Sequence, residues 1–364
     1  MGHIFLSFLF YNIILIIVYK HYKRGEYYIK KTDLFFYTLL LIAYGTYGNG
    51  EGDYLHYKEN VNMIHSLYDV LRQDGMEIQY NYLSFLVDGN YDLWRFVIFS
   101  IQFIGMSWLL YKAKLNTYPV LLGFITICLI LYTYQRSYWG VIFYFLGVFL
   151  FLEKRNIVFL IIVALCYIAH TQNIVLLALL PVGFINLKKW HILAIILMFG
   201  IITTIFSDYF NTFLDSGGVE GADYINNKMS RYGESGGNHF GSSIGEYLIF
   251  ILRYVPTILI ILTCVRLILK NKYQSLYLPY RRIINIALGL VMVSLVFLFG
   301  SVGSATFFYR ILSMTLFPVS LFLPYLVKNK IIKKQIFNNY INVFIICAEL
   351  NYLKDLYYAY SHGI

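Results

Sequence analysis

The chain has 364 residues, of which 59% are hydrophobic and 13% are charged, and its formal net charge is +10. Soluble domains carry roughly 25% charged residues, so this composition excludes an ordinary soluble protein. Because apolar runs recur along the whole length, we expect a single membrane domain, residues 1–364, in place of the several soluble domains that such a length allows.

The apolar segments predict an all-α, polytopic integral membrane protein with about 12 transmembrane helices, since a span needs roughly 17 to 25 residues. Several segments are shorter than this length, and helix tilt and flanking aromatic anchors can accommodate the difference. The four tryptophans lie at predicted span ends, as in an interfacial belt. Whether the last segment crosses the membrane stays open. The expected spans are residues 4–19, 34–48, 93–111, 120–134, 138–152, 157–170, 174–185, 192–207, 247–269, 283–300, 311–327 and 337–350.

The distribution of Lys and Arg between alternate loops predicts the orientation in the membrane. One set of loops, with Arg266 at a span end, holds 20 of the 29 basic residues and 3 of the 19 acidic residues. We expect this set to be cytoplasmic. The other loops and both termini then lie outside.

Two of the expected outer loops are long: residues 49–92 and residues 208–245. The second is rich in glycine and small polar residues, which favours a mobile cover. Within it, Tyr224, Arg231 and Tyr232 are among the residues best able to hold a ligand. In the first loop, four apolar residues share one face of an expected helix: Ile64, Leu67, Tyr68 and Leu71.

Three arginines lie at or near outer span ends: Arg136, Arg253 and Arg310. Placing an arginine at hydrocarbon depth costs about 2.5 to 3.5 kcal/mol on insertion scales. That cost is offset if the guanidinium binds two phosphate oxygens at once. The alternative is that these side chains reach out to lipid headgroups.

Residues 131–173 form an expected membrane hairpin, in which a charged turn at residues 153–155 joins two apolar segments. Arg136 and His170 should therefore return to the same outer face. Histidine takes up a proton near neutral pH, and a neighbouring arginine would lower the pKa of His170 and keep it available as a base. The alternative is a packing residue, as a lone histidine in an apolar helix usually is.

The first outer loop holds two further pairs of an acid and aromatic residues. Asp53 follows a glycine-rich stretch and has Tyr54 and Tyr57 beside it. The acid would accept hydrogen bonds from sugar hydroxyls while the rings stack on the sugar; the alternative is a carboxylate that caps the next helix. Glu77 with Tyr80 is the second pair, and a solvated surface is its alternative. No spacing of histidines predicts a metal site.

The order of these residues resembles the EpsG-like branch of bacterial polysaccharide polymerases, which includes many Wzy polymerases of O-antigen and capsule. The matching residues, in chain order, are Asp53 with Tyr57, Glu77 with Tyr80, Arg136, His170, Arg231 with Tyr232, and Arg310. The chain departs from the family pattern where an arginine often precedes the Asp, where a tyrosine often follows the late Arg, and where Gln135-Arg136 reverses a frequent Arg-Gln pair.

The resemblance implies a polymerase, a glycosyltransferase that joins oligosaccharide repeat units linked to undecaprenyl pyrophosphate, at the periplasmic face of a bacterial inner membrane. The product would be O-antigen or capsular polysaccharide. The implied partners are the lipid-linked donor and acceptor and the lipid bilayer, and whether a chain-length regulator binds stays open. We expect no cofactor, metal, nucleotide sugar or nucleic acid.

For this reaction we expect His170 to be the general base, with Asp53 as the second candidate. Arg136 and Arg310 would stabilise the leaving pyrophosphate, and Arg231 would join them when the glycine-rich loop closes. The residues expected to bind substrate are Tyr54, Tyr57, Glu77, Tyr80, Tyr224, Arg231, Tyr232 and Arg253.

Two other functions fit a polytopic membrane protein. A flippase or transporter of the lipid-linked oligosaccharide would be expected to place polar residues at mid-membrane and to show repeat symmetry, and the sequence shows neither. A membrane acyltransferase would use a histidine, but we expect its site to open to the cytoplasm, opposite to His170.

Overall fold

The computed structural model describes residues 2–47, 53–72, 77–130, 132, 138–191, 244–299 and 310–361, and these are almost entirely helical. Within those ranges no β-sheet forms, and an isolated bridge joins Tyr28 to Thr117. The expectation of an all-α fold is confirmed. The chain divides into two compact units, one of residues 1–177 and 320–364 and one of residues 178–319.

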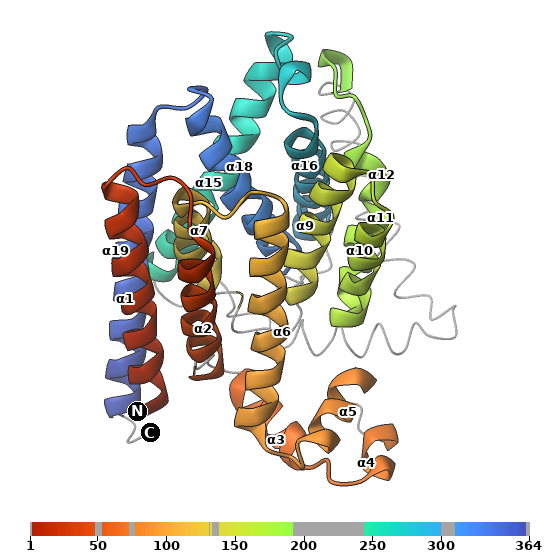
Figure 1. Cartoon of the computed structure of the whole chain (residues 1–364), viewed down its shortest axis with the longest axis vertical. Helices are drawn as coiled ribbons and strands as arrows, with labels where there is room; N and C mark the ends of the chain where they lie inside the picture. The colour runs from red at the N-terminus through yellow and green to blue at the C-terminus, as the bar shows by residue number, and fades with distance from the viewer. Residues whose placement is uncertain are drawn as a thin grey trace. The chain divides into compact units, whose positions relative to one another are not determined.

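The first unit is a layer of long helices in which neighbours along the chain pack on one another. Helix α2 packs against α1 and α6, α9 packs against α6 and α10, and α19 returns to pack beside α1 (Figure 1). The bounds are α1 Gly2–Lys23, α2 Lys31–Tyr47, α6 Tyr91–Lys112, α7 Tyr118–Gly123, α9 Tyr138–Lys154, α10 Val158–Ala169, α18 Leu316–Lys328 and α19 Lys334–Ser361. After α7 comes a π-helical segment, Phe124–Leu129.

Local sequence signals explain where these helices begin. The Asn90 side chain accepts a hydrogen bond from the backbone N–H of Leu93 at 3.0 Å and so caps α6. The Thr117 side chain caps α7, and Pro119 lies in the first turn of that helix, where its missing N–H costs nothing. Buried apolar side chains then run down one side of α6.

Two glycines let α9 approach α10 closely. A Cβ atom on Gly140 would lie 2.5 Å from the Cβ of Ala169 and 2.8 Å from the carbonyl oxygen of Cys166. A Cβ atom on Gly147, seven residues further on, would lie 2.9 Å from a methyl group of Val163. The beginning of α9 therefore lies directly beside the end of α10, as the expected hairpin requires.

The expected outer loop at residues 49–92 contains three short helices: α3 Asp53–Asn62, α4 Leu67–Arg72 and α5 Ile78–Leu86. They gather near the first turns of α6 (Figure 1). Their shared core contains Val61, Ile64, Val70, Tyr80 and Trp94.

This small core corrects two expectations. The expected single apolar helix face is broken, because Ile64 is buried in a turn while Leu67, Tyr68 and Leu71 on α4 are exposed. Trp94 is not an interfacial anchor, since it is 3% exposed and its indole N–H lies 3.3 Å from the carbonyl oxygen of Tyr80.

The second unit is described over a smaller part of its length. After His170, a 3-10 turn, Thr171–Asn173, and most of the short helix α11 Ile174–Ala178 still belong to the first unit, and the second unit begins at Ala178 and contains α12 Leu180–Gly183. Helix α15 Ile244–Leu269, a 3-10 turn at Tyr273–Ser275 and α16 Leu278–Phe299 follow. Helix α12 packs on α16.

Four helices in the described ranges are long and apolar enough to cross a membrane by length and composition: Phe5–Lys23, Tyr91–Lys112, Leu278–Leu295 and Arg310–Lys328. Shorter apolar helices occupy other expected spans: Tyr118–Leu129, Val158–Ala169, Thr171–Gly183 and Tyr254–Leu269. The arrangement is that of a polytopic membrane protein. The expected span at residues 192–207 and residues 208–243 of the expected loop lie outside the described residues.

Candidate functional site

His170 lies where the α10 helix stops. The last residue of α10 is Ala169, and His170 is extended, with φ −169° and ψ 137°. Its Nδ1 accepts a hydrogen bond from the backbone N–H of Gln172 at 3.0 Å and caps the 3-10 turn that follows. His170 thus ends one helix, as expected, and its side chain caps the turn that follows.

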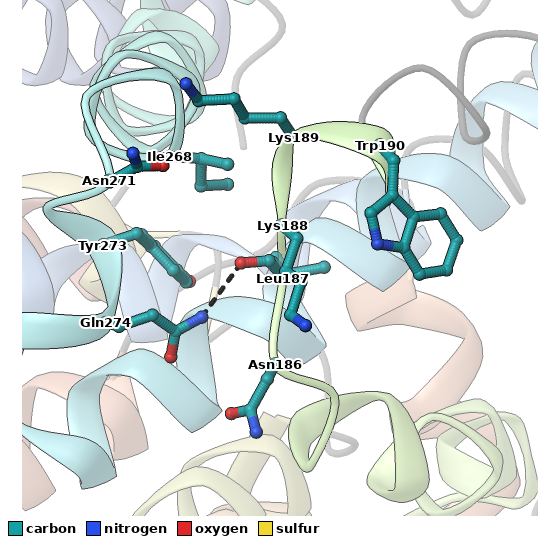
Figure 2. A pocket seen from close by; sticks show the side chains of 9 residues that line it. All are labelled: Asn186, Leu187, Lys188, Lys189, Trp190, Ile268, Asn271, Tyr273 and Gln274. Atoms are coloured by element: carbon teal, nitrogen blue, oxygen red, sulfur yellow. Dashed lines mark hydrogen bonds between the residues drawn. The ribbon is translucent and has the colours of Figure 1, made fainter.

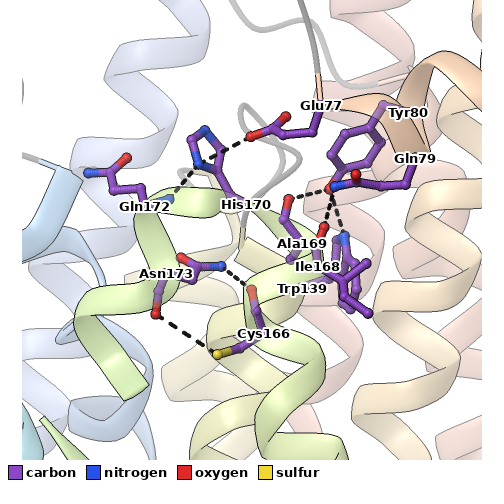
Figure 3. A network of polar contacts seen from close by, with 10 residues as sticks. All are labelled: Glu77, Gln79, Tyr80, Trp139, Cys166, Ile168, Ala169, His170, Gln172 and Asn173. Carbon is purple, nitrogen blue, oxygen red and sulfur yellow. Dashed lines mark hydrogen bonds and ion pairs between the residues drawn. The ribbon is translucent and has the colours of Figure 1, made fainter. Parts of the chain in front are cut away.

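Glu77 faces His170 across the gap between α5 and α10. It is the residue that precedes α5, and its Oε1 lies 3.3 Å from Nδ1 of His170. Figure 3 shows the two side chains pointing toward one another from these two elements. The exposed fractions of the side chains are 22% for His170 and 16% for Glu77, so both groups keep limited access to solvent.

The same ring nitrogen of His170 takes part in both contacts, and its protonation decides between them. A neutral ring with its lone pair on Nδ1 accepts the N–H of Gln172. A ring with its proton on Nδ1 donates to the carboxylate of Glu77 instead, and its Nε2 then keeps a lone pair that can take up a proton. Because either state has a partner, the arrangement suits a group that takes up a proton and gives it back.

Side chains at the start of α5 bind the carbonyl groups at the end of α10. The Tyr80 hydroxyl donates to the carbonyl oxygen of Ala169 at 2.6 Å, and Gln79 Nε2 donates to that of Ile168. The last carbonyls of a helix have no partner within the helix, so α5 supplies them. These bonds hold Glu77, at the head of α5, over His170.

Trp139 and Asn173 complete this support (Figure 3). The indole N–H of Trp139, on α9, donates to the Tyr80 hydroxyl at 3.0 Å. The Asn173 side chain is buried, and its Nδ2 donates to the carbonyl oxygen of Cys166 at 2.9 Å across the helix break. The three elements α5, α9 and α10 therefore meet at His170.

Of the other candidates in the first outer loop, only some have side chains that the structure describes. Tyr57 is half-buried and its ring centroid lies 6.3 Å from that of Trp94. Asp53 and Tyr54 form the first turn of α3, and their side chains lie outside the described part of the chain. Tyr80 is 3% exposed and its hydroxyl bonds to Ala169 and Trp139, which makes it a support of the His170 and Glu77 pair.

Each of the arginine candidates lies either outside the described residues or in the second unit. Arg136, Tyr224, Arg231 and Tyr232 lie outside those residues. The backbone of Arg253 lies in α15, and Arg310 begins the helical stretch that leads to α18, both in the second unit. The pairing of Arg136 with His170 stays a prediction, and among the described residues the acid Glu77 lies beside His170.

Three residues with structural roles were not predicted from the sequence: Gln79, Trp139 and Arg95. Arg95 is 5% exposed in α6, and its Nε donates to the carbonyl oxygen of Gly45, near the end of α2, at 3.1 Å. A cation there satisfies a carbonyl that α2 leaves without a partner and lies favourably at the negative end of the helix dipole. Arg95 could have been predicted, because it is an ionisable residue inside an expected span. Gln79 and Trp139 have no comparable feature in the sequence.

The described residues contain no group of three or more His, Cys, Asp or Glu side chains that could hold a metal ion. The helices and their apolar surfaces define the class as an all-helical, multi-pass membrane protein. The profile of the EpsG family matches residues 33–362, and the chain belongs to that family. No curated protein and no solved structure matches the chain. The EpsG family is associated with polysaccharide polymerases, so the role of the chain lies in polysaccharide biosynthesis.

Proposed function

We propose that this protein joins oligosaccharide repeat units carried on undecaprenyl pyrophosphate into O-antigen or capsular polysaccharide, at the outer face of a bacterial inner membrane. The observation that carries the proposal is the pair of His170 and Glu77, 3.3 Å apart at the end of a membrane hairpin. Membership of the EpsG family supports a polymerase of this kind. The reaction uses no cofactor.

In the proposed reaction, a sugar hydroxyl of the acceptor attacks the anomeric carbon of the donor glycan. With its own proton on Nδ1 directed at Glu77, His170 takes the hydroxyl proton on Nε2 as a general base. A bond forms between the hydroxyl oxygen and the anomeric carbon, and the bond from that carbon to the lipid pyrophosphate breaks, so the pyrophosphate leaves with the electron pair. Glu77 stabilises the protonated ring of His170 through the Nδ1 contact. Asp53 is the second candidate for the base.

The leaving pyrophosphate develops negative charge, which fixed cations stabilise. We assign this role to Arg136 and Arg310, with Arg231 added from the glycine-rich loop. Arg253 would contact the donor phosphates. The sugars would lie against Tyr54, Tyr57, Tyr224 and Tyr232.

A flippase of the same pathway is the alternative function. Transport needs a path for the glycan across the membrane, whereas polymerisation needs a base held at one face. The support of His170 by α5 and α9 favours polymerisation, because this support fixes a proton-accepting group in place beside an acid.

The test is complementation of a strain that lacks the gene, with surface glycan analysed on gels. We expect wild-type protein to restore the ladder of polymer lengths, and His170→Ala and Glu77→Gln to leave a single repeat unit. The chain offers a matched control in the same outer loop. His65 Nδ1 lies 3.2 Å from Asp88 Oδ1, but both side chains are exposed, so His65→Ala and Asp88→Asn should restore a normal ladder.

The outcomes separate the functions. A normal ladder from well-expressed His170→Ala and Glu77→Gln proteins would refute the proposed site. Loss of every repeat unit from the surface of the deletion strain would indicate a flippase, and altered decoration of full-length polymer would indicate an acyltransferase.

A further inference from the structure

The second unit contains a cavity of about 590 Å³ between the chain after α12 and the turn that joins α15 to α16 (Figure 2). Polar and basic side chains from both segments line it, including Asn186, Lys188, Lys189, Trp190, Asn271 and Gln274. Both segments belong to the basic set of loops, which we expect to be cytoplasmic. The proposed polymerase reaction does not use this cavity.

Hydrogen bonds hold the two walls of the cavity together. Gln274 Nε2 donates to the carbonyl oxygen of Leu187 at 2.9 Å, as Figure 2 shows. Arg281 in turn donates to the carbonyl oxygen of Gln274 at 2.8 Å. The loop that carries Lys188 and Lys189 is therefore fixed against the turn that carries Gln274.

A second group of bonds anchors the beginning of the same loop. Asn285 Nδ2 donates to the carbonyl oxygen of Ile185 at 2.8 Å, and Arg282 donates to the same oxygen at 3.0 Å. The Tyr273 hydroxyl orients Asn285 by donating to its Oδ1 at 2.7 Å. The guanidinium groups of Arg281 and Arg282 thus serve the protein itself, and Lys188 and Lys189 are the cations that line the cavity.

The segments that frame the cavity hold positive charge without any acid to balance it. The sequence contains no Asp or Glu from residue 154 to residue 207 or from residue 247 to residue 348. Six basic residues lie in the two cavity-forming loops and at the start of α16: Lys188, Lys189, Lys270, Lys272, Arg281 and Arg282. A ligand that brings negative charge would balance them.

The surroundings favour a ligand that lies at the membrane surface. Trp190 is 62% exposed and stacks on His191 with ring centroids 3.6 Å apart. Leu269, at the end of α15, and Phe184, after α12, are also exposed. Tryptophan with exposed apolar groups beside lysines is typical of the level of lipid headgroups.

We propose that this cavity binds the phosphate headgroup of an anionic phospholipid. The ammonium groups of Lys188 and Lys189 pair with the phosphate, the side-chain amides of Asn186 and Asn271 donate hydrogen bonds to its oxygens, and Trp190 lies at the level of the upper acyl chains. In Figure 2 the Lys189 side chain reaches toward the end of α15 near Asn271. The inference is independent of the polymerase reaction.

The test is native mass spectrometry of the purified full-length protein, delipidated in detergent and titrated with phosphatidylglycerol or phosphatidylcholine. We expect phosphatidylglycerol to bind more tightly than phosphatidylcholine. The Lys188→Gln/Lys189→Gln protein should bind phosphatidylglycerol roughly thirtyfold more weakly, because each lysine near an anionic headgroup contributes about 1 kcal/mol. Trp190→Phe should weaken binding without changing the charge.

Lys330→Gln/Lys333→Gln is the matched control, since it removes the same charge from another basic loop and lines neither this cavity nor its walls. Equal affinity of the control and cavity variants, both folded by circular dichroism, would overturn the proposal. Equal binding of the two lipids would also overturn it. Full displacement of phosphatidylglycerol by millimolar inorganic phosphate would overturn the lipid proposal as well, because it would show that the cavity binds a soluble phosphate.

Discussion

At the scale of single residues, Tyr80 links the candidate site to the helices around it. Its hydroxyl donates to the carbonyl oxygen of Ala169 and accepts the indole N–H of Trp139, so one oxygen joins α5, α9 and α10. His170 and Glu77 carry the proposed chemistry, whereas Tyr80 determines where they lie. The two roles separate experimentally.

Tyr80→Phe should lower stability and shorten the polymer without abolishing it. The change leaves a buried carbonyl and a buried indole N–H without this partner, and an unsatisfied buried group costs about 1 to 3 kcal/mol. Thermal unfolding in detergent measures the loss, and glycan gels measure the chain length. Tyr82→Phe is the control, because Tyr82 lies on the same helix and is exposed. Equal unfolding temperatures for the two variants would contradict the role of Tyr80.

Arg95→Met should destabilise the contact between α2 and α6. The guanidinium donates to the carbonyl oxygen of Gly45 from a buried position, and hydrogen bonds to charged groups contribute about 1.5 to 3 kcal/mol. Arg95→Lys keeps the charge near the end of α2 and should recover part of the loss. Thermal unfolding in detergent provides the comparison, and a wild-type melting temperature for Arg95→Met would show that the bond contributes little.

At the scale of elements, close packing of α9 on α10 positions the end of the hairpin. Gly140 and Gly147 face α10, and the tighter of the two approaches is at Gly140, beside Ala169 and so next to His170. The contacts at Gly147 are longer, at 2.9 Å to a methyl group of Val163 and 3.1 Å to the carbonyl oxygen of Phe159. The two positions therefore differ in their effect on the site.

Gly140→Ala should cost stability and activity together. The new methyl group would overlap the backbone of α10, and overpacking costs typically about 1 to 3 kcal/mol. Gly147→Ala should be milder in unfolding experiments and should preserve the glycan ladder, since it lies further from His170. If Gly147→Ala proved the more damaging substitution, the account of the hairpin packing would be wrong.

The short helix α4 depends on a capping box whose strength follows pH. The Ser66 hydroxyl and the backbone N–H groups of His65 and Ser66 donate to Asp69 Oδ2, and these bonds lower the pKa of Asp69. A depressed pKa means that the stabilisation is present above the unfolded value, about 3.9, and is lost as pH falls through the folded value.

Amide exchange protection in α4 should therefore fall between pH 6 and pH 3. Asp69→Asn should give weak protection at both pH values, because the amide accepts less strongly than the carboxylate. Hydrogen exchange with mass spectrometry resolves this segment. Unchanged protection in Asp69→Asn at pH 6 would show that the cap does not hold α4.

At the scale of the whole molecule, the uneven distribution of basic residues predicts which loops face outward. Glu59 on α3 lies in the expected outer loop, and Lys154 at the end of α9 lies in an expected inner turn. In intact cells, a membrane-impermeant maleimide should label Glu59→Cys and should label Lys154→Cys only after permeabilisation. Cys128, Cys166 and Cys264 are buried and should contribute little background. The reverse labelling pattern would place His170 at the cytoplasmic face.

Sequence reasoning located the helices and the helix end at His170 because apolar runs and a polar Ala-His-Thr-Gln-Asn ending are local signals. It did not pair His170 with Glu77, because these residues are far apart in the chain and no local pattern links α5 to the end of α10. It also misread Trp94, since a tryptophan at a span end fits a lipid anchor and a small protein core equally well. Long-range packing decided both cases.

The most direct test of the central claim is a reaction with purified components. Wild-type protein in vesicles, supplied with a repeat unit on undecaprenyl pyrophosphate, should produce glycans of several repeat units and release the lipid pyrophosphate, and His170→Ala should produce neither. Movement of the lipid-linked unit across the bilayer without any joining of units, or polymer formation by His170→Ala equal to wild type, would contradict the account.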